Sequence, residues 1–286
     1  MTGNVMLTLE GRVKVFVLGF AAEHGFAVWI EAGRQKILLD TGAGKALPIN
    51  REQCGIDFAQ ATALVLSHGH YDHTGGIGAF LSGNQTAVVY AAPGFDRPRF
   101  SCRPGEKARA IGLQAEGRRQ IQALPPERFH LVTGPLRLAP RIGLTGAIPR
   151  LCPFEDPGGP FFFDAEATLP DPIEEDQALW FETVDGLVIL TGCCHAGLVN
   201  TIERVRVLSG QSRIHGIIGG FHLLNASEER LAQTFAAVQD WNPAFILPCH
   251  CTGNPVMARL CAHFGSETVR PGRVGMILPL ELPEGL

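Results

Sequence analysis

The chain has 286 residues, 45% of them hydrophobic and 18% charged, and a formal net charge of −4. These values exclude disordered, coiled-coil and nucleic-acid-coating proteins, because strong charge bias marks those classes. The length allows one large domain or two fused halves. We expect a globular protein with no nucleic-acid partner.

The opening residues lack the basic-then-apolar pattern of a secretory signal, and no stretch approaches the ~20 apolar residues of a membrane span. Eight cysteines in so long a chain predict reduced thiols rather than bridges. Some are expected near a metal, because histidines adjoin Cys193, Cys194, Cys249 and Cys251. A cytoplasmic protein without a membrane partner is expected.

Strand patterns fill the first third of the chain. In "RVKVFVL" the apolar residues Val13, Val15 and Val17 alternate, and "FAVWIEAGRQKILLDTG" predicts two strands around a turn at Gly33. The next apolar run, "ATALVLS", is short enough for a buried strand. It leads directly into "HGHYDH", so a histidine cluster is predicted at the carboxyl end of a strand.

Two middle segments carry opposite charge. Residues 94–128 hold eight Lys or Arg against four Asp or Glu, whereas residues 151–176 hold eight acids and no Lys or Arg. We interpret them as insertions in a single domain. They either meet over one site or form separate, solvated surface loops.

The last hundred residues alternate strand and helix patterns. Strands are predicted at "GLVILTG", "IHGIIGG" and "AFILP", and helices by the apolar faces Leu198, Ile202 and Val205, and Leu231, Phe235 and Val238. Asn225, with Glu228 three residues later, predicts the N-cap of the second helix. Histidines follow each strand, at His195, His222 and His250. In α/β sheets ligand chemistry gathers at such carboxyl ends.

The histidine cluster "SHGHYDHTGG" gives the strongest chemical signal. In an extended segment His68, His70 and Asp72 face one side and His73 the other. Imidazole and carboxylate together suit Zn²⁺, with Mn²⁺ or Fe as alternatives, and such mixtures are typical of catalytic sites. Unpaired buried polar groups cost roughly 1–3 kcal/mol each, and a bound cation removes that cost.

The cluster matches the H-x-H-x-D-H signature, and the sequence resembles the metallo-β-lactamase fold superfamily. "ILLDTG" supplies the supporting Asp40, and "GLVILTGCCHAGLVNTI", "IIGGFHL" and "PCHCTG" are similar to the subgroup named after the archaeal dihydropterin-ribofuranosylaminobenzene phosphate synthase. The resemblance implies an α/β fold, a four-layer αββα sandwich. It implies one domain over residues 1–286, with loop insertions near 94–128 and 151–176, and a metal site at a sheet edge.

The resemblance also implies a ligand set. His68 and His70 would bind a first metal, and a second metal would be bound by Asp72, His73 and His250. Cys193 takes the place of a bridging aspartate. The third ligand of the first metal usually comes from the region that resembles "GPLRLAPRIGLTGAIPR", which contains no histidine. His195 is expected to replace it, with His222 as the rival, and one metal instead of two remains open.

Other polar residues are assigned less specific roles. Arg150 can bind a substrate anion through its planar guanidinium, or form a loop salt bridge. Arg97, Arg99 and Arg103 are further candidates. The histidines outside the motifs are expected to be structural or exposed on the surface; they are His24, His130, His215 and His263.

We expect an enzyme with a small-molecule substrate and one or two Zn²⁺ ions. Metal-assisted hydrolysis would use Asp72 as ligand and proton acceptor, with His222, or His195 if it is not bound to metal, as the acid. The subgroup resemblance implies instead a transferase that condenses a dihydropterin diphosphate with a ribosylaminobenzene phosphate. Relatives with diiron centres carry glutamate where His70 stands here, which disfavours redox chemistry. A non-catalytic metal-dependent sensor or binding module is the alternative.

Overall fold

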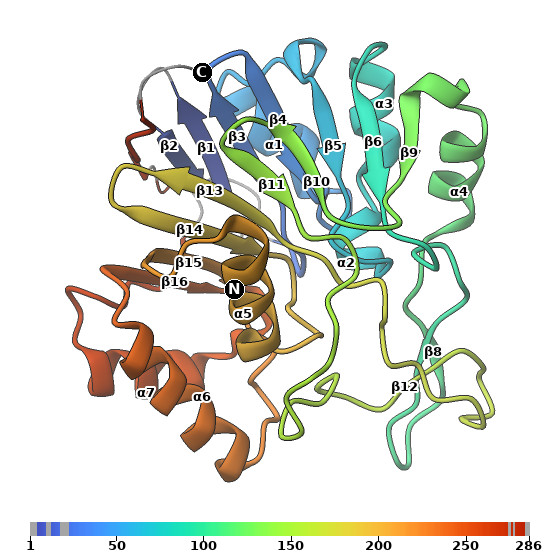
Figure 1. Ribbon diagram of the computed structural model, residues 1–286. Helices are drawn as coiled ribbons and strands as arrows, with labels where there is room; N and C mark the ends of the chain where they lie inside the picture. Colours follow the sequence, from blue (N-terminus) through green and yellow to red (C-terminus); the bar gives the residue numbers. More distant parts are fainter. Residues whose placement is uncertain (1–4, 10–12, 18–22, 274–275, 277, 284–286) are drawn as a thin grey trace.

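The computed structural model describes residues 5–9, 13–17, 23–273, 276 and 278–283. Within these residues, two large β-sheets of seven and six strands pack against each other, and a small three-stranded sheet lies beside one margin (Figure 1). Helices cover both outer faces, so the layers run helix, sheet, sheet, helix. The predicted four-layer α/β sandwich is confirmed.

The seven-stranded sheet has the order β2-β1-β3-β4-β5-β6-β9, and its strands from β4 to β9 are parallel. β3 and β4 are antiparallel and turn at Gly33, whose φ is 59°, as predicted. The run at Val13–Val17 is β2, but its predicted alternation concerns side chains outside those described. The strands are β1 (Val5–Leu9), β2 (Val13–Val17), β3 (Val28–Ala32), β4 (Gln35–Leu39), β5 (Ala63–Val65), β6 (Val88–Ala91) and β9 (Phe129–Leu131).

The six-stranded sheet has the order β10-β11-β13-β14-β15-β16. β14, β15 and β16 run parallel, so their carboxyl ends meet at one edge. These are the three strands predicted in the last hundred residues, and the prediction is confirmed. The strands are β10 (Leu136–Ala139), β11 (Ile142–Leu144), β13 (Leu179–Thr183), β14 (Gly186–Thr191), β15 (Ile214–Gly220) and β16 (Phe245–Cys249).

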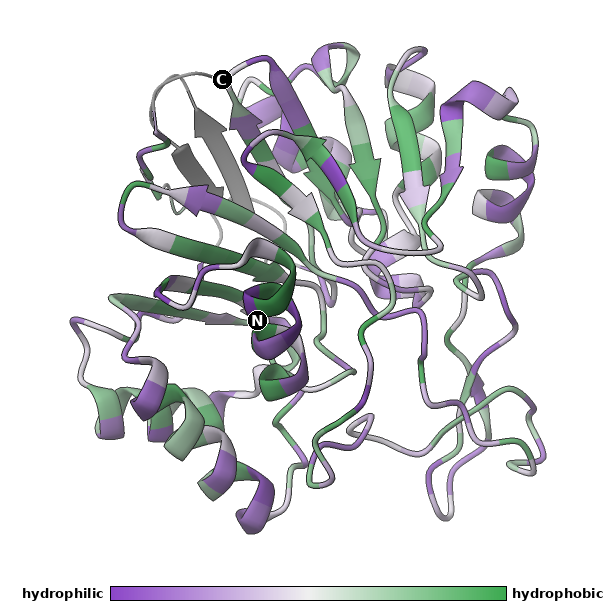
Figure 2. Cartoon of the chain, viewed as in Figure 1, coloured by the Kyte–Doolittle hydropathy of each residue, from purple (hydrophilic) through white to green (hydrophobic). Residues whose placement is uncertain are grey.

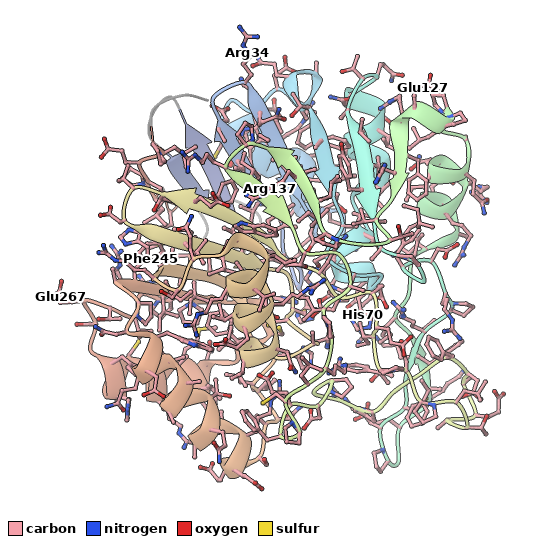
Figure 3. All side chains as sticks on the ribbon, in the orientation of Figure 1. Arg34, His70, Glu127, Arg137, Phe245 and Glu267 are labelled. Carbon is pink, nitrogen blue, oxygen red and sulfur yellow. The ribbon has the colours of Figure 1, made fainter. Side chains whose placement is uncertain are left out.

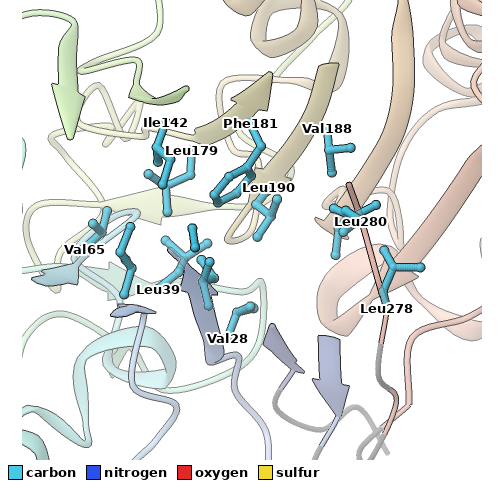
Figure 4. Packing of buried hydrophobic residues seen from close by; sticks show 14 of the residues in the cluster. Val28, Leu39, Val65, Ile142, Leu179, Phe181, Val188, Leu190, Leu278 and Leu280 are labelled. Atoms are coloured by element: carbon cyan, nitrogen blue, oxygen red, sulfur yellow. The ribbon is translucent and has the colours of Figure 1, made fainter. Parts of the chain in front are cut away.

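The main core lies between the two sheets (Figure 4). Side chains alternate along each strand, so β14 directs Val188 and Leu190 into this core and Leu187 and Ile189 toward the outer helices. Both faces of the strand are therefore apolar, as expected for parallel strands covered on both sides. Each fully buried side chain of this size contributes about 1.5–3 kcal/mol.

The helices place their apolar faces on the sheets and their polar faces outward (Figure 2). The first sheet is covered by α1 (Ala46–Gln53), α3 (Ile77–Gly83) and α4 (Ala115–Gln122), and the second by α5 (Leu198–Ser209), α6 (Glu228–Trp241) and α7 (Asn254–Phe264). Short helical turns are α2 (Tyr71–Thr74), η1 (Phe58–Gln60), η2 (Pro126–Arg128) and η3 (His250–Thr252). None of the described helices is long and apolar enough to cross a membrane.

The predicted N-cap of α6 is wrong by two residues. The helix begins at Glu228, and its cap is Ser227, whose hydroxyl accepts a hydrogen bond from the Arg230 N–H at 3.1 Å. A serine oxygen satisfies that amide as well as asparagine would, so Asn225 is not needed. The predicted apolar residues Leu231, Phe235 and Val238 do face the core.

The two oppositely charged segments meet. Strand β7 (Phe100–Ser101) of the basic segment pairs with both β8 (Arg109–Ala110) and β12 (Phe161–Phe162), and β12 belongs to the acidic segment. Beside this small sheet, the buried Arg99 guanidinium forms ion pairs with Asp171, at 2.8 Å, and with Glu175. The alternative of two separate solvated loops is wrong for these residues.

Candidate metal centre

Polar side chains gather where parallel strands of both sheets end. Asp40 follows β4, His68 lies just beyond β5, and His195, His222 and His250 follow β14, β15 and β16. The packing of the sheets brings these carboxyl ends to a common margin, where Figure 3 labels His70. The site therefore draws on both halves of the chain.

Several of these strand ends turn through a left-handed backbone conformation. The φ angles are 58° at Asp40, 60° at Cys194, 44° at His222 and 46° at His250. Such angles cost non-glycine residues of order 1–3 kcal/mol each and concentrate at functional sites. Here they turn the chain abruptly, so that the following side chains enter the site instead of continuing the sheet.

The histidine motif is only partly extended, which corrects one prediction. Its helical turn α2 begins at Tyr71, with His70 as the N-cap residue. Asp72 therefore does not lie with His68 and His70, as continuous extended geometry would require. Instead Asp72 Oδ2 lies 3.9 Å from His73 Nε2, on the other side of the site.

The imidazole group consists of His68, His70 and His195, whose ligand atoms lie within 4.8 Å of one another. All three Nε2 atoms are buried and have no hydrogen-bond partner among the described residues. His195 Nδ1 lies 2.8 Å from the carbonyl oxygen of Pro157, and His68 Nδ1 lies 2.9 Å from the Ser67 hydroxyl. If Nδ1 of His195 donates to that carbonyl, its Nε2 carries a lone pair that points toward the other rings.

Burial is the main cause that lowers the pKa of each ring of the imidazole group well below its ordinary value; nearby histidines act in the same direction, and at His70 burial outweighs the opposing effect of Asp72. The rings are therefore neutral at neutral pH. Neutral imidazole is the form that binds metal. An unsatisfied buried nitrogen costs roughly 1–3 kcal/mol, and three that converge are explained by a cation that accepts all three lone pairs.

The mixed group consists of Asp72, His73, Cys193 and His250. His250 Nε2 lies 3.1 Å from Asp72 Oδ2 and 3.3 Å from His73 Nε2, and the Cys193 sulfur lies 3.0 Å from the same His73 nitrogen. Burial opposes ionisation of Asp72, but the charge of His73 and hydrogen bonds from His24 and His250 hold its pKa well below the ordinary value. The carboxylate is therefore ionised.

Asp40 links the two groups. Its carboxylate accepts hydrogen bonds from His73 Nδ1 at 2.6 Å and from the Ser67 amide and hydroxyl at 2.7 and 2.6 Å. Burial lowers the pKa of His73, but Asp40 and Asp72 outweigh it and raise the pKa to about 9. Such outer partners fix the orientation of ligand histidines. The supporting role that the resemblance implied for Asp40 agrees with this geometry.

Cys193 and Cys251 bring sulfur to the mixed group. Their sulfur atoms and a nitrogen of His250 lie within 4.8 Å of one another. Burial raises the pKa of Cys193, as does its hydrogen bond with Cys251. Burial also opposes ionisation of Cys251, but that bond and the nearby rings of His222 and His250 lower its pKa well below the usual value. All eight cysteines are free, as predicted.

A cavity of about 500 Å³ opens over the two groups. Its lining includes Asp72, His222 and Cys193, together with Arg103 and Arg109 of the basic segment. Glu106 also lines the cavity, as do Phe161 and Tyr71. The inserted segments thus supply the outer wall of the site, with both positive charge and aromatic surface.

His222 and Arg150 take different positions. His222 lines the cavity, and its ring centroid lies 4.2 Å from that of His195. Arg150 does not line it: its guanidinium donates hydrogen bonds to the carbonyl oxygens of His195, at 2.6 Å, and Pro172, at 2.5 Å. The structure therefore places Arg150 where it supports the backbone of His195, and Arg103 and Arg109 are better placed to meet a substrate anion.

His24 lies at the site, although the sequence around it predicts only a structural or exposed histidine. Its side chain is 65% exposed, but Nε2 lies 3.2 Å from Asp72 Oδ2, and the ring contacts that of His250. His24 stands alone just before β3, with no pattern around it. Only the pairing of β3 with β4, together with the backbone hydrogen bond from Phe26 to Asp72, brings it to the cluster.

The donor atoms fit a transition metal. Imidazole nitrogen, carboxylate oxygen and thiol sulfur are the ligands that Zn²⁺ takes in proteins, and buried unpaired nitrogens need such a partner. Residues 21–209 match the model of the metallo-beta-lactamase superfamily. This chain belongs to the metallo-beta-lactamase superfamily.

More specific relatives are also found. A 7,8-dihydropterin-6-methyl-4-(beta-D-ribofuranosyl)-aminobenzene-5'-phosphate synthase of Methanocaldococcus jannaschii is 31% identical over 245 residues, which cover 82% of each chain. The crystal structure of Tm1679, described as a metal-dependent hydrolase of the beta-lactamase superfamily, is 26% identical, with a TM-score of 0.73 over 94% of this chain and 97% of that one. YhfI from Bacillus subtilis shares the fold, with a TM-score of 0.57 and 13% identity over 94% of this chain and all of that one.

Proposed function

We propose that the chain is a metal-dependent enzyme, a hydrolase or a transferase, that acts on a phosphorylated or pterin-like small molecule. The observation that carries this proposal is the convergence of three buried, unpartnered Nε2 atoms, one of which belongs to His70 in the lining of the cavity. Zn²⁺ is the expected metal, in one or two copies per chain, with Mn²⁺ or Fe as alternatives.

The geometry supports separate roles for the two groups. We assign the imidazole group to one metal position and the mixed group to a second, with His195 as the ligand that the motif alone does not supply. When bound, the cation supplies Lewis acidity, which polarises a phosphoryl or carbonyl oxygen and acidifies water. The chain must then orient the substrate and move protons.

Two residues of the cavity wall are placed for proton transfer. We assign Asp72 as the proton acceptor because its carboxylate is ionised and lines the cavity. His222 faces the cavity, and its Nδ1 has no hydrogen-bond partner within the described part of the chain. We assign His222 to protonation of the leaving group.

The cavity favours an anionic, planar substrate. Arg103 and Arg109 bring positive charge to the lining of the cavity, and guanidinium groups bind phosphate with paired hydrogen bonds. Phe161 provides an aromatic face on which a ring system can stack. The name of the 31%-identical relative includes both a dihydropterin and a 5'-phosphate, which supports this substrate class.

A substrate panel tests the proposal. The purified protein is assayed with phosphodiester, lactone, thioester and dihydropterin-diphosphate substrates, before chelation, after chelation and after addition of Zn²⁺ or Mn²⁺. We expect turnover of a phosphorylated or pterin substrate that is lost on chelation and restored by metal. Turnover of only the lactone or thioester would contradict the substrate class. Ligand binding without turnover of any substrate would support the sensor and overturn the enzyme.

Variants separate catalysis from metal binding. His222→Asn is expected to lower kcat about 100-fold or more and leave the metal content unchanged, because general acid catalysis contributes about 10²–10⁴-fold. His130→Asn is the matched control, since this ring is on the exposed strand β9, away from the site. An unchanged kcat in His222→Asn would contradict the role assigned to His222.

A further inference from the structure

Two thiols from different strands approach each other beside His250. Cys193 follows β14 and Cys251 follows β16, so the central strand β15 lies between them. They meet across its last residue, Gly220: a Cβ there would lie 2.6 Å from the Cys251 sulfur and 3.3 Å from the Cys193 Cα. A larger side chain would fill the space that the sulfur atoms use.

The neighbouring cysteines face elsewhere. The Cys194 sulfur contacts the Thr201 hydroxyl at 3.3 Å, and Cys249 packs in the core between the sheets. Neither lines the cavity, whereas Cys193 and Cys251 both do. Of Cys193 and Cys194, therefore, only Cys193 faces the site. Of Cys249 and Cys251, only Cys251 does. Hydrophobic burial alone does not explain why these two sulfurs are presented together.

The two thiols complete a donor set around His250. A ring nitrogen of His250 and both sulfur atoms lie within 4.8 Å of one another, and Asp72 Oδ2 lies 3.1 Å from His250 Nε2. Sulfur and nitrogen donors from Cys193, Cys251 and His250 can therefore meet at one ion, and Asp72 contacts His250 from outside this group of three. The motif H-x-H-x-D-H accounts for Asp72, but not for Cys251.

We propose that Cys251 is a metal ligand together with Cys193, so that the metal position at His250 carries two thiolates. This inference rests on the proposed metal-dependent function and specifies the metal class. Soft thiolate ligands favour Zn²⁺ and related thiophilic ions, whereas Mn²⁺ and Mg²⁺ prefer oxygen. The position at His250 should therefore bind Zn²⁺ in preference to Mn²⁺. The imidazole group, which has no thiolate, should distinguish less between these two metals.

Cobalt substitution tests the inference without any assay of activity. Thiolate bound to Co²⁺ gives a strong charge-transfer absorption in the near ultraviolet that imidazole and carboxylate do not give. The full chain is chelated, reloaded with Co²⁺ and measured by absorption and elemental analysis. The test variants are Cys193→Ser and Cys251→Ser, and the matched controls are Cys194→Ser and Cys249→Ser, which replace neighbouring thiols that face away from the cavity.

We expect the band in the unaltered protein, a weaker band in each test variant, none in their combination and an unchanged band in both controls. Zn²⁺ affinity at this position should fall at least about 10-fold in Cys251→Ser, with a smaller loss for Mn²⁺. Cys251→Asp keeps a donor at the site and should retain metal while its preference moves toward Mn²⁺.

Three results would overturn the inference. A full band in metal-loaded Cys251→Ser would remove Cys251 from the ligand set. Full metal content with no band in the unaltered protein would exclude thiolate ligation but leave the proposed metalloenzyme intact. A folded protein that binds no Co²⁺ or Zn²⁺ at all would overturn both this inference and the proposed function.

Discussion

The imidazole group and the mixed group lie side by side but differ in chemistry. The first holds three neutral rings whose Nε2 atoms have no partner among the described side chains. The second is internally bonded: the His73 ring contacts the Cys193 thiol at 3.0 Å, and the His250 ring contacts the Asp72 carboxylate at 3.1 Å. One group is explained only by a cation, whereas the other is satisfied in part by its own hydrogen bonds.

The difference teaches that neighbouring metal positions need not bind metal in the same way. The rings of the imidazole group are already deprotonated, so they can accept a cation without releasing protons. The mixed group holds a proton on His73, whose pKa is about 9, and metal must displace it. The two positions should therefore respond differently to substitution and to pH.

The largest effect is expected when one ligand of each group is removed. The double variant His68→Ala with Asp72→Ala should lose most of its bound metal, because each group then lacks a donor. Elemental analysis after dialysis measures the loss. His130→Ala with Asp57→Ala is the matched control, since both residues lie away from the site. Full metal content in the test variant would refute the ligand assignment.

Asp40→Asn should weaken both groups. Asparagine cannot accept all the hydrogen bonds that Asp40 receives from Ser67 and His73, so both ligand rings lose their orientation. We expect metal affinity to fall about 10- to 100-fold, as measured by calorimetric titration. Asp57→Asn, which changes a carboxylate that caps η1, should bind metal normally. Equal affinities in both variants would show that Asp40 does not orient the ligands.

The response to pH should separate the groups. Because the pKa of His73 is about 9 and burial raises the pKa of the Cys193 thiol, metal binding to the mixed group should release protons from both side chains at pH 7.5, and its affinity should rise at least about 10-fold per pH unit below pH 9. Affinity at the imidazole group should be nearly constant above the ordinary histidine pKa of about 6.5. Titration in buffers of different ionisation enthalpy counts the protons. Equal proton release at both positions would contradict the comparison.

The same proton affects the stability of the chelated protein. The pKa of His73 is higher in the folded chain than its unfolded value of 6.5, so its interaction with Asp40 stabilises the fold fully below pH 6.5. That contribution is lost as pH rises through about 9. The melting temperature of the chelated protein should therefore fall over this range, and the fall should be smaller in His73→Asn.

The smallest effect is expected at the contact between the acidic segment and the histidine motif. Glu175 accepts a hydrogen bond from the Gly69 amide at 3.2 Å, between the ligands His68 and His70. Glu175→Gln keeps an acceptor for the Gly69 amide, so affinity at the imidazole group should fall only by about 1 kcal/mol, or roughly fivefold. The variant also removes a charge that pairs with the buried Arg99, so a separate loss of folding stability is expected. The mixed group should not change. Equal losses at both positions would show a general effect on folding.

Much of the fold could be predicted because its signals are local. The apolar runs at β14, β15 and β16 and the turn at Gly33 each depend on a few neighbouring residues. The cap of α6 was misplaced because Asn225 and Ser227 offer similar oxygen acceptors. The pairing of β7 with β12 joins segments about sixty residues apart, and charge alone left open whether they meet.

Those residues of the site that stand in local motifs could also be predicted. His68, His70 and Asp72 stand in one short motif, and His195 and His250 follow recognisable strands. Their division into two groups was not predictable from extended geometry, because α2 begins inside the motif. The neighbourhood of His24 depends on long-range pairing, which no local pattern of residues encodes.

Metal analysis of the folded, purified protein, followed by titration of the chelated chain with Zn²⁺, tests the central claim most directly. We predict about one to two ions per chain, with the mixed group releasing protons and the imidazole group not. A folded protein with no metal, and with no measurable affinity for any divalent ion, would contradict the account.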